Sequence, residues 1–315
     1  MKSFPFVTLV SGVFAASALS GCVSPSKVSS GDERRIRNKT FVITGASSGF
    51  GKGVALKLGA SGANVVLADI RGALLTKIAA DIRASGGRAI TVTTDVAKAE
   101  DINRLAQAAT RAFGHVDVWM NNVGVGAIGR FDDIPLRDHS RLIDINVKGV
   151  IYGSHVALRL FKAQGYGTIV NTGSIDSEVP LAYQGSYSAS KAAVLSLGRV
   201  LNEELRLSGI KTISVATIMP WAVDTPWWTH AANYSGHKTR MAAMDDPGKI
   251  VDAMVRASIH PKEEVVVGWK AKASYMSHHI FPDATERLSA NIAHREMLKG
   301  APEATHSGSL HRPMP

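Results

Sequence analysis

Tyr187 and Lys191 are four residues apart and form a Tyr-x-x-x-Lys pattern. In a helix, this spacing places both side chains on one face. An ammonium beside a phenol favours the phenolate, so we expect the pKa of Tyr187 to fall from about 10 toward neutral pH. A tyrosine tuned in this way can exchange a proton with a substrate oxygen. The same spacing is common on solvated helices, so the pair needs support from the rest of the chain.

Ser174 supplies a third polar group upstream of this pair. It follows residues 168–172, an apolar run that predicts a strand. A hydroxyl at the carboxyl end of a strand is well placed to hydrogen-bond the same substrate oxygen. Together, the three side chains predict proton transfer at a carbon–oxygen group.

A glycine-rich turn spans residues 44–51, between a β-rich run at 39–43 and an apolar-periodic helical run at 52–58. Glycines in this context let the backbone approach a pyrophosphate, whose charge meets the helix N-terminus. Asp69 closes the next predicted strand, 20 residues beyond Gly49. A carboxylate at that distance accepts hydrogen bonds from the adenosine ribose of a dinucleotide. The two linked signals predict a dinucleotide site.

With these motifs, the chain resembles the short-chain dehydrogenase/reductase family from about Lys39 to about Gly268. The family's Thr-Gly-x-x-x-Gly-x-Gly turn matches residues 44–51, and its Asn-Asn-Ala-Gly motif matches residues 121–124. The resemblance implies a catalytic set of Asn146, Ser174, Tyr187 and Lys191. In this set, the tyrosine is the general acid/base and the lysine lowers its pKa and binds the nicotinamide ribose. The serine orients the substrate oxygen, and the asparagine supports the lysine through a water.

The resemblance also implies a set of cofactor-binding residues, in which Asp95 and Val96 lie beside the adenine. The full set is Gly45, Ser47, Ser48, Gly49, Phe50, Gly51, Asp69, Asp95, Val96, Asn122, Gly124, Tyr187, Lys191, Pro220 and Val223. Asp69 would repel a 2′-phosphate and Ser48 carries no positive charge, so NAD(H) is favoured. Arg71 keeps NADP(H) possible. The histidines lack metal-ligand spacing, and we expect no metal site.

One departure from the family lies after the sixth strand, where its Pro-Gly is Pro220-Trp221 here. This indole puts the shape of the pocket in doubt more than the chemistry. The irregular segment that follows, residues 220–246, corresponds to the family's mobile substrate flap and is rich in aromatic residues. Trp227, Trp228 and Tyr234 either cover an apolar substrate or pack the flap on the core or on another subunit.

The order of the predicted elements indicates the fold class. Strands are expected near 39–44, 64–69, 88–94, 116–120, 167–172, 211–217 and 264–267, and helices near 50–61, 71–85, 98–114, 138–163, 187–209 and 246–259. Such alternation predicts an α/β fold: a doubly wound, mostly parallel seven-stranded Rossmann sheet with helices on both faces. We expect one domain over residues 38–298 and a disordered tail over 299–315.

Composition narrows the possible partners. The chain has 315 residues, 45% of them hydrophobic, and a formal net charge of +10. Its basic residues are scattered and form no nucleic-acid-binding motif, which argues against nucleic acid as a partner. The resemblance implies a homodimer or tetramer, paired through the helices near 138–163 and 187–209.

The first 22 residues resemble a bacterial lipoprotein signal peptide. Lys2 precedes an apolar run that ends in Leu-Ser-Gly before Cys22, the only cysteine. We therefore expect Cys22 to carry lipid, residues 23–37 to form a polar tether, and the protein to lie in the cell envelope. An uncleaved N-terminal anchor and a cytoplasmic enzyme remain alternatives. A lipid-anchored location conflicts with the cofactor, because free nicotinamide dinucleotides belong to the cytoplasm.

These features predict an NAD(P)-dependent oxidoreductase acting on the CH–OH or C=O group of a small-molecule alcohol or carbonyl substrate. The alternative is a membrane-tethered, non-catalytic nucleotide-binding or scaffold protein. The intact set of Asn146, Ser174, Tyr187 and Lys191 argues against that alternative.

Overall fold

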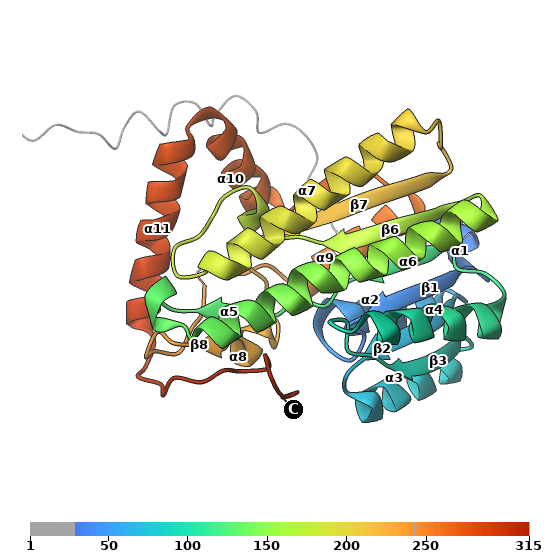
Figure 1. Cartoon of the computed structure of the whole chain (residues 1–315), viewed down its shortest axis with the longest axis horizontal. Helices are drawn as coiled ribbons and strands as arrows, with labels where there is room; N and C mark the ends of the chain where they lie inside the picture. The colour runs from blue at the N-terminus through green and yellow to red at the C-terminus, as the bar shows by residue number, and fades with distance from the viewer. Residues whose placement is uncertain (1–28, 242, 315) are drawn as a thin grey trace, which may run out of the picture.

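A seven-stranded sheet forms the centre of the structure, a computed structural model that describes residues 29–241 and 243–314 (Figure 1). Every strand pairing in this sheet is parallel. In spatial order, the strands are β3 (Arg88–Thr93), β2 (Asn64–Asp69), β1 (Thr40–Thr44), β4 (Val118–Asn121), β6 (Gly167–Thr172), β7 (Ile213–Pro220) and β9 (Glu264–Val267). The predicted doubly wound sheet is confirmed.

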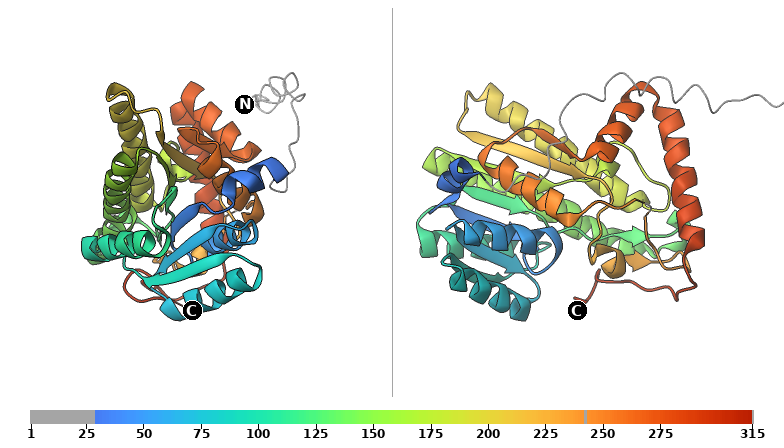
Figure 2. Two further views of the ribbon diagram at one scale, coloured as in Figure 1. Left: turned by 90° about the vertical axis from the view of Figure 1, so that its right-hand side faces the viewer. Right: turned by 180° about the vertical axis from the view of Figure 1, so that it is seen from behind.

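Helices cover both faces of the sheet, as Figure 2 shows. One face packs against α2 (Gly49–Ala60), α3 (Gly72–Ala84) and α9 (Pro247–Ile259). The other packs against α4 (Ala99–Phe113), α6 (Gly149–Gln164) and α7 (Gly185–Leu207). Strands β1, β2 and β4 are buried along their whole length. Burial on both faces explains why these strands read as continuous apolar runs rather than as alternating ones.

The sheet order reverses between β1 and β4, which lie side by side at its centre. In a doubly wound sheet, ligands bind beyond the carboxyl ends of the strands at such a switch point. Asp69 ends β2 and Asn121 ends β4, while Ser174 follows β6. The sheet therefore brings the predicted site residues to one edge.

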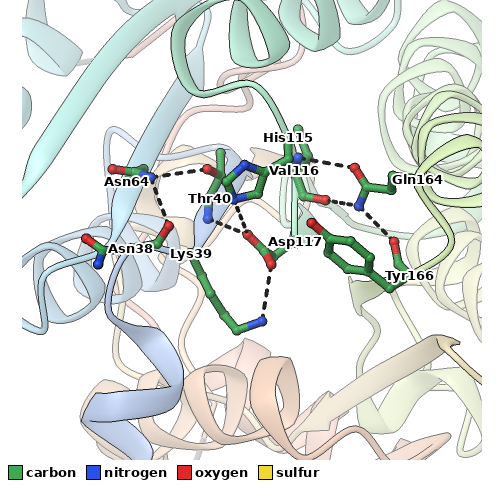
Figure 3. A network of polar contacts seen from close by, with 9 residues as sticks. All are labelled: Asn38, Lys39, Thr40, Asn64, His115, Val116, Asp117, Gln164 and Tyr166. Atoms are coloured by element: carbon green, nitrogen blue, oxygen red, sulfur yellow. Dashed lines mark hydrogen bonds and ion pairs between the residues drawn. The ribbon is translucent and has the colours of Figure 1, made fainter.

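The opposite edge of the central strands is held by Asp117 (Figure 3). Its carboxylate accepts hydrogen bonds from the Thr40 backbone amide at 2.8 Å and from Lys39 Nζ at 3.1 Å, and it pairs with His115 at 3.1 Å. Gln164 joins this region through bonds with both backbone groups of Val116. These contacts fix the amino ends of β1 and β4, so the polar network has a structural role far from the carboxyl-end site.

The long helix expected near 138–163 contains a π-helical turn. Helix α5 (Leu136–Ile143) leads into a π-helix (Asp144–Lys148), which continues as α6. The π turn carries Asn146, one of the predicted catalytic residues. Single π turns inside helices occur often at functional sites, and here the turn sets the direction of Asn146.

Several elements were not predicted. They are α1 (Ser30–Ile36), α8 (Trp227–His230), α10 (Trp269–Ile280), α11 (Pro282–Lys299), short 3₁₀ turns (Phe131–Asp133 and Ile175–Ser177), and a two-stranded sheet of β5 (Ala127–Ile128) and β8 (Ala232–Asn233). Helix α1 lies where we expected only a polar tether, because Ser29 caps it and Ile36 is fully buried in the core. Helices α10 and α11 form a hairpin beside the carboxyl-end edge (Figure 1).

The tail also differs from the expectation of disorder over 299–315. Its backbone bonds to the loop after β8, with a bridge between Asn233 and His306, and the side chain of Leu310 is 1% exposed. His311 Nε2 lies 2.8 Å from Asp138 Oδ1. A single buried leucine and these polar contacts hold a segment whose composition alone indicates a loop.

The N-terminal prediction lies outside the described residues, since these begin at residue 29. The signal peptide and Cys22 therefore have no structural account. Within the described ranges, no helix is both long and apolar enough to cross a bilayer.

Candidate active site

The glycine-rich turn between β1 and α2 forms one wall of the site. Gly45 and Gly49 have φ angles of 68° and 52°, in the left-handed region that favours glycine. A Cβ at Gly51 would overlap the carbonyl of Gly45, whereas a Cβ at Gly49 would meet nothing within 4 Å. The turn is therefore tight on its inner side and open toward the cavity.

The open side of this turn offers donors for an anion. Ser47 Oγ is buried and has no hydrogen-bond partner among the described residues. Ser48 is the N-cap of α2, but its side chain makes no capping hydrogen bond. Free amides at a helix N-terminus and an unpaired hydroxyl fit a pyrophosphate. The geometry of the turn thus fits the pyrophosphate of a dinucleotide.

Asp69 lies at the end of β2 and is paired with Arg71. Asp69 Oδ1 accepts hydrogen bonds from the Arg71 amide at 3.0 Å and from Nε at 3.3 Å, while Oδ2 accepts from the Ser47 amide at 3.3 Å. Arg71 Nη2 also donates to Ser48 Oγ at 2.7 Å. The carboxylate expected to bind a ribose and the guanidinium expected to tolerate a phosphate therefore lie side by side.

A cavity of about 460 Å³ extends from this turn to the substrate side. Most predicted site residues line it, namely Gly45, Ser48, Gly49, Phe50, Asp69, Asp95, Val96, Asn122, Gly124, Ser174, Tyr187, Lys191, Pro220 and Val223. Ser47, Gly51 and Asn146 lie outside this lining. Among the lining residues, Asn122 Nδ2 donates to the Thr44 carbonyl at 3.1 Å and so holds the turn.

Tyr187 lies in the first turn of α7, with Lys191 one turn later. Lys191 Nζ donates a hydrogen bond to the Thr172 carbonyl at 2.7 Å and lies 5.6 Å from the centre of the Tyr187 ring. A Cβ at Gly124 would come within 3.2 Å of this Nζ. The predicted helix therefore places both groups on one face, and Gly124 leaves room for the ammonium.

Asn146 connects the loop after β4 to α7. Its Oδ1 accepts from the Val125 amide at 2.9 Å, and its Nδ2 donates to the Val125 carbonyl at 2.9 Å and to Ser190 Oγ at 3.0 Å. Direct protein contacts thus use both ends of the amide. Its expected water-mediated support of Lys191 stays a prediction.

The pKa of Tyr187 is shifted in the opposite direction to the one expected. Burial raises the pKa of the phenol above its usual range, the charge of Asp176 adds to this rise, and the Ser174 hydroxyl opposes it. Burial also lowers the pKa of Lys191 to about 8, against the charge of Asp176. The expected lowering of the Tyr187 pKa was wrong for the protein alone, because burial and the charge of Asp176 raise this pKa.

Asp176 was missed by the sequence analysis. It lies two residues after Ser174, is 8% exposed and lines the cavity. Burial raises the pKa of its carboxyl to about 7, and the Lys191 charge opposes the rise. A signal was present in the sequence, since a charged residue directly follows Ser174 and Ile175 at the end of a buried strand.

Aromatic side chains from the segment after β7 cover the substrate side. The Trp227 ring lies 5.1 Å from the Tyr187 ring and 5.0 Å from Trp228. Trp228 Nε1 donates to the Val223 carbonyl at 2.9 Å. Trp221 packs with the buried cluster of Ile175, Val179 and Ala271, and it also lines the cavity. These tryptophans line the cavity and Trp221 also packs on the core, while their covering of an apolar substrate stays a prediction.

The C-terminal part of the chain closes the remaining side. Residues of α10 and α11 and the segment 309–314 line the cavity. Arg141 Nε donates to the Leu310 carbonyl at 3.1 Å, and Arg71 Nη1 donates to the Met314 carbonyl at 3.2 Å. This segment thus lies beside Arg71, on the cofactor side of the cavity.

Metal ligands are not gathered in the part of the chain that the structure describes. No group of three or more His, Cys, Asp or Glu side chains there could hold a metal ion.

Several known proteins have sequences similar to this chain. A family model described as short chain dehydrogenase matches residues 39–234. "Uncharacterized oxidoreductase YxnA" of Bacillus subtilis is 32% identical over 262 residues, covering 82% of this chain and 73% of that protein. "Diacetyl reductase [(S)-acetoin forming]" of Staphylococcus epidermidis is 35% identical over 217 residues, covering 69% of this chain and 81% of that protein.

Two solved structures are similar as well. The 3-ketoacyl-(acyl-carrier-protein) reductase of Brucella melitensis, complexed with NADH, has a TM-score of 0.66 and 27% identity, covering 75% of this chain and 99% of that one. The alcohol dehydrogenase of Thermococcus sibiricus, complexed with 5-hydroxy-NADP, has a TM-score of 0.63 and 27% identity, covering 72% and 93%. The family match spans more than half of this chain, and the sheet, the glycine turn and the Tyr187–Lys191 pair agree with it. The chain therefore belongs to the short-chain dehydrogenase family.

Proposed function

We propose that the protein interconverts an alcohol and a carbonyl compound with a nicotinamide cofactor. The observation that carries this proposal is one cavity that brings Ser174, Tyr187 and Lys191 to the same side of the sheet as the anion-binding turn of α2. Relatives named for reducing diacetyl and a 3-ketoacyl group, and one named alcohol dehydrogenase, support the same reaction type.

Each residue of the site has a chemical task in this reaction. Tyr187 donates a proton to the carbonyl oxygen during reduction and takes it back during oxidation. Ser174 orients that oxygen, and Lys191 holds positive charge beside the phenol, which offsets part of the cost of forming a phenolate. When bound, the nicotinamide cofactor supplies or accepts the hydride. Asn146 positions α7 through Ser190.

The cofactor itself is held by residues of the turn and the neighbouring strand ends. Ser47, Ser48 and the first amides of α2 bind the pyrophosphate, Asp69 binds the adenosine ribose, and Asp95 and Val96 lie beside the adenine. We propose NAD(H) as the preferred cofactor, because the Asp69 carboxylate disfavours a 2′-phosphate. The ion pair of Asp69 with Arg71 leaves some tolerance for NADP(H).

The experiment that tests the reaction measures absorbance of the reduced nicotinamide with a panel of ketones, aldehydes and alcohols. We expect oxidation of the reduced cofactor with at least one carbonyl compound and the reverse reaction with its alcohol. Binding of NAD(H) without turnover of any compound would favour the non-catalytic alternative. That alternative is not favoured, because every acid/base group is in place.

We propose, as a separate point, that Cys22 carries lipid and anchors the enzyme in the cell envelope. The support comes from the sequence alone: a charged start, a short apolar run and Leu-Ser-Gly before the only cysteine. Mass spectrometry of the N-terminal peptide from the native host tests it. A lipidated Cys22 at the mature N-terminus is expected, and unmodified Met1 on most molecules would refute it.

A further inference from the structure

Asp176 carries a carboxyl group that no part of the described chain satisfies. Its backbone amide donates to Ser174 Oγ at 3.1 Å, which fixes the residue in the 3₁₀ turn after β6. Its side chain is buried and lines the cavity, yet no described residue donates a hydrogen bond to it. Its oxygens are not sealed off from solvent, so a ligand that enters the cavity can donate a hydrogen bond to them.

The carboxyl lies close to the reacting groups. Its charge raises the pKa of Tyr187 and of Lys191, so it shares their small volume. The amide bond to Ser174 ties it to the hydroxyl that orients the substrate oxygen. Asp176 therefore lies next to Ser174 in the cavity lining, so a substrate whose reacting oxygen meets Ser174 can present a neighbouring group to Asp176.

Charge decides which group can bind there. A cationic amine would lie beside the Lys191 ammonium, and an anionic group would lie beside the carboxyl itself. A neutral hydroxyl avoids both repulsions and donates to the carboxyl, which keeps an acceptor oxygen in either protonation state. The Trp227 ring lies 5.1 Å from the Tyr187 ring, and Trp221 also lines the cavity, so these indoles favour an apolar remainder of the substrate.

We propose that Asp176 is a specificity-determining residue that binds a hydroxyl on the carbon next to the reacting carbon. The substrates are then α-hydroxy ketones and the vicinal diols that they form, with an apolar substituent against the tryptophans. In the reduction, one hydride adds to the carbonyl carbon and one proton adds to its oxygen, and the hydroxyl held by Asp176 is unchanged. This inference rests on the proposed alcohol–carbonyl activity.

The test compares acetophenone, α-hydroxyacetophenone and α-aminoacetophenone, which differ at one position. We expect wild-type kcat/KM to be highest for the hydroxy ketone. Asp176→Ala should lower the ratio of kcat/KM for the hydroxy ketone to kcat/KM for acetophenone by about 10–100-fold, since only the hydroxy ketone loses a hydrogen bond, whereas any change in the acidity of Tyr187 affects both substrates. Asp176→Asn keeps an acceptor and should retain part of the preference, which also covers the case that Asp176→Ala fails to fold.

Asp224→Ala serves as the matched control. Its carboxylate lies on the segment after β7, is largely exposed and pairs with Arg240 at 3.6 Å, and it does not line the cavity. This variant should keep the wild-type preference. Turnover of acetophenone without any preference for the hydroxy ketone, or an equal loss on both substrates in the Asp176 variants, would overturn the inference and leave the proposed reaction intact. A preference for the amino ketone would also overturn it. No turnover of any ketone would overturn both.

Discussion

The ammonium of Lys191 lies 5.6 Å from the centre of the Tyr187 ring, while one of its three N–H groups donates to the Thr172 carbonyl at 2.7 Å. Lys191 is therefore anchored to the end of β6. Burial and the charge of Asp176 raise the pKa of Tyr187, and the Ser174 hydroxyl opposes this rise. The free protein holds Tyr187 protonated, which suits a general acid in carbonyl reduction.

Replacing Tyr187 with Phe removes this acid and leaves the ring against Trp227 in place. We expect turnover to fall by at least about 10²–10⁴-fold, the usual contribution of general acid/base catalysis. Cofactor affinity and thermal unfolding should stay near wild type. Tyr183→Phe is the control, because its hydroxyl bonds to His294 at 2.7 Å and its side chain does not line the cavity. Near-full turnover by Tyr187→Phe would remove the proposed mechanism.

Cofactor choice depends on the pair of Asp69 and Arg71. Asp69→Ala frees the guanidinium from the carboxylate and removes the acceptor for a ribose hydroxyl. We expect affinity for NAD(H) to fall and affinity for NADP(H) to rise, reversing a wild-type preference for NAD(H). Titration of both cofactors by fluorescence measures this change. Tighter binding of NADP(H) than NAD(H) by the wild type would show that Arg71 dominates, and Arg71→Ala should then abolish that preference.

The sheet and the reacting residues could be predicted because their constraints are local. The strands buried on both faces read as apolar runs, and Tyr187 and Lys191 need only one helix to meet. Asp69 reaches the glycine turn because the length of one β-α-β unit fixes its position along the chain. Patterns of this kind can be recognised in a sequence without knowledge of the rest of the fold.

The parts of the site that the sequence did not predict depend on contacts between distant segments. Helices α10 and α11 bury few side chains, among them Ala271, Thr285 and Ala293, so they show no apolar stripe. The tail is held by Leu310 and by backbone groups, which leave no periodic signal. The raised pKa of Tyr187 follows from its burial in the assembled cavity, and the spacing of residues in the sequence does not indicate this burial.

The buried carboxyl of Asp176 makes stability depend on pH. Its pKa is raised from 3.8 to about 7 in the folded protein, so between these values the folded state holds a proton that the unfolded state releases. The free energy of unfolding therefore falls as pH rises through this window. Asp176→Asn lacks the effect, and its stability relative to wild type should rise by on the order of 2 kcal/mol between about pH 4.5 and pH 6.5. Urea unfolding at the two pH values measures this difference, and a pH-independent difference would contradict it.

The outer surfaces of α6 and α7 predict how subunits pair. Ile151, Val200 and Leu207 are exposed on these helices, at 44%, 50% and 75%. Apolar side chains on two long neighbouring helices suit a symmetric interface. We expect residues 29–315 to sediment as a dimer or tetramer at micromolar concentration. Val200→Glu should shift the protein toward monomer, whereas a wild-type protein that is only monomeric would refute this interface.

The segment 309–314 predicts slow release of the cofactor. We infer that it lies across the entrance to the cavity, because it lines the cavity, the Met314 carbonyl accepts from Arg71 and His311 pairs with Asp138. Ending the chain after Gly308 removes Leu310 and these contacts but no strand or helix of the main fold. We expect the truncated protein to release bound NADH at least about 10-fold faster, because about 1.4 kcal/mol of lost contacts is enough for that change. Stopped-flow displacement of NADH, followed by its fluorescence, gives the rate. His311→Ala, which breaks one contact and keeps Leu310, should give an intermediate rate. An unchanged rate in the truncated protein, with an unchanged melting temperature, would show that the segment rests on the entrance without closing it.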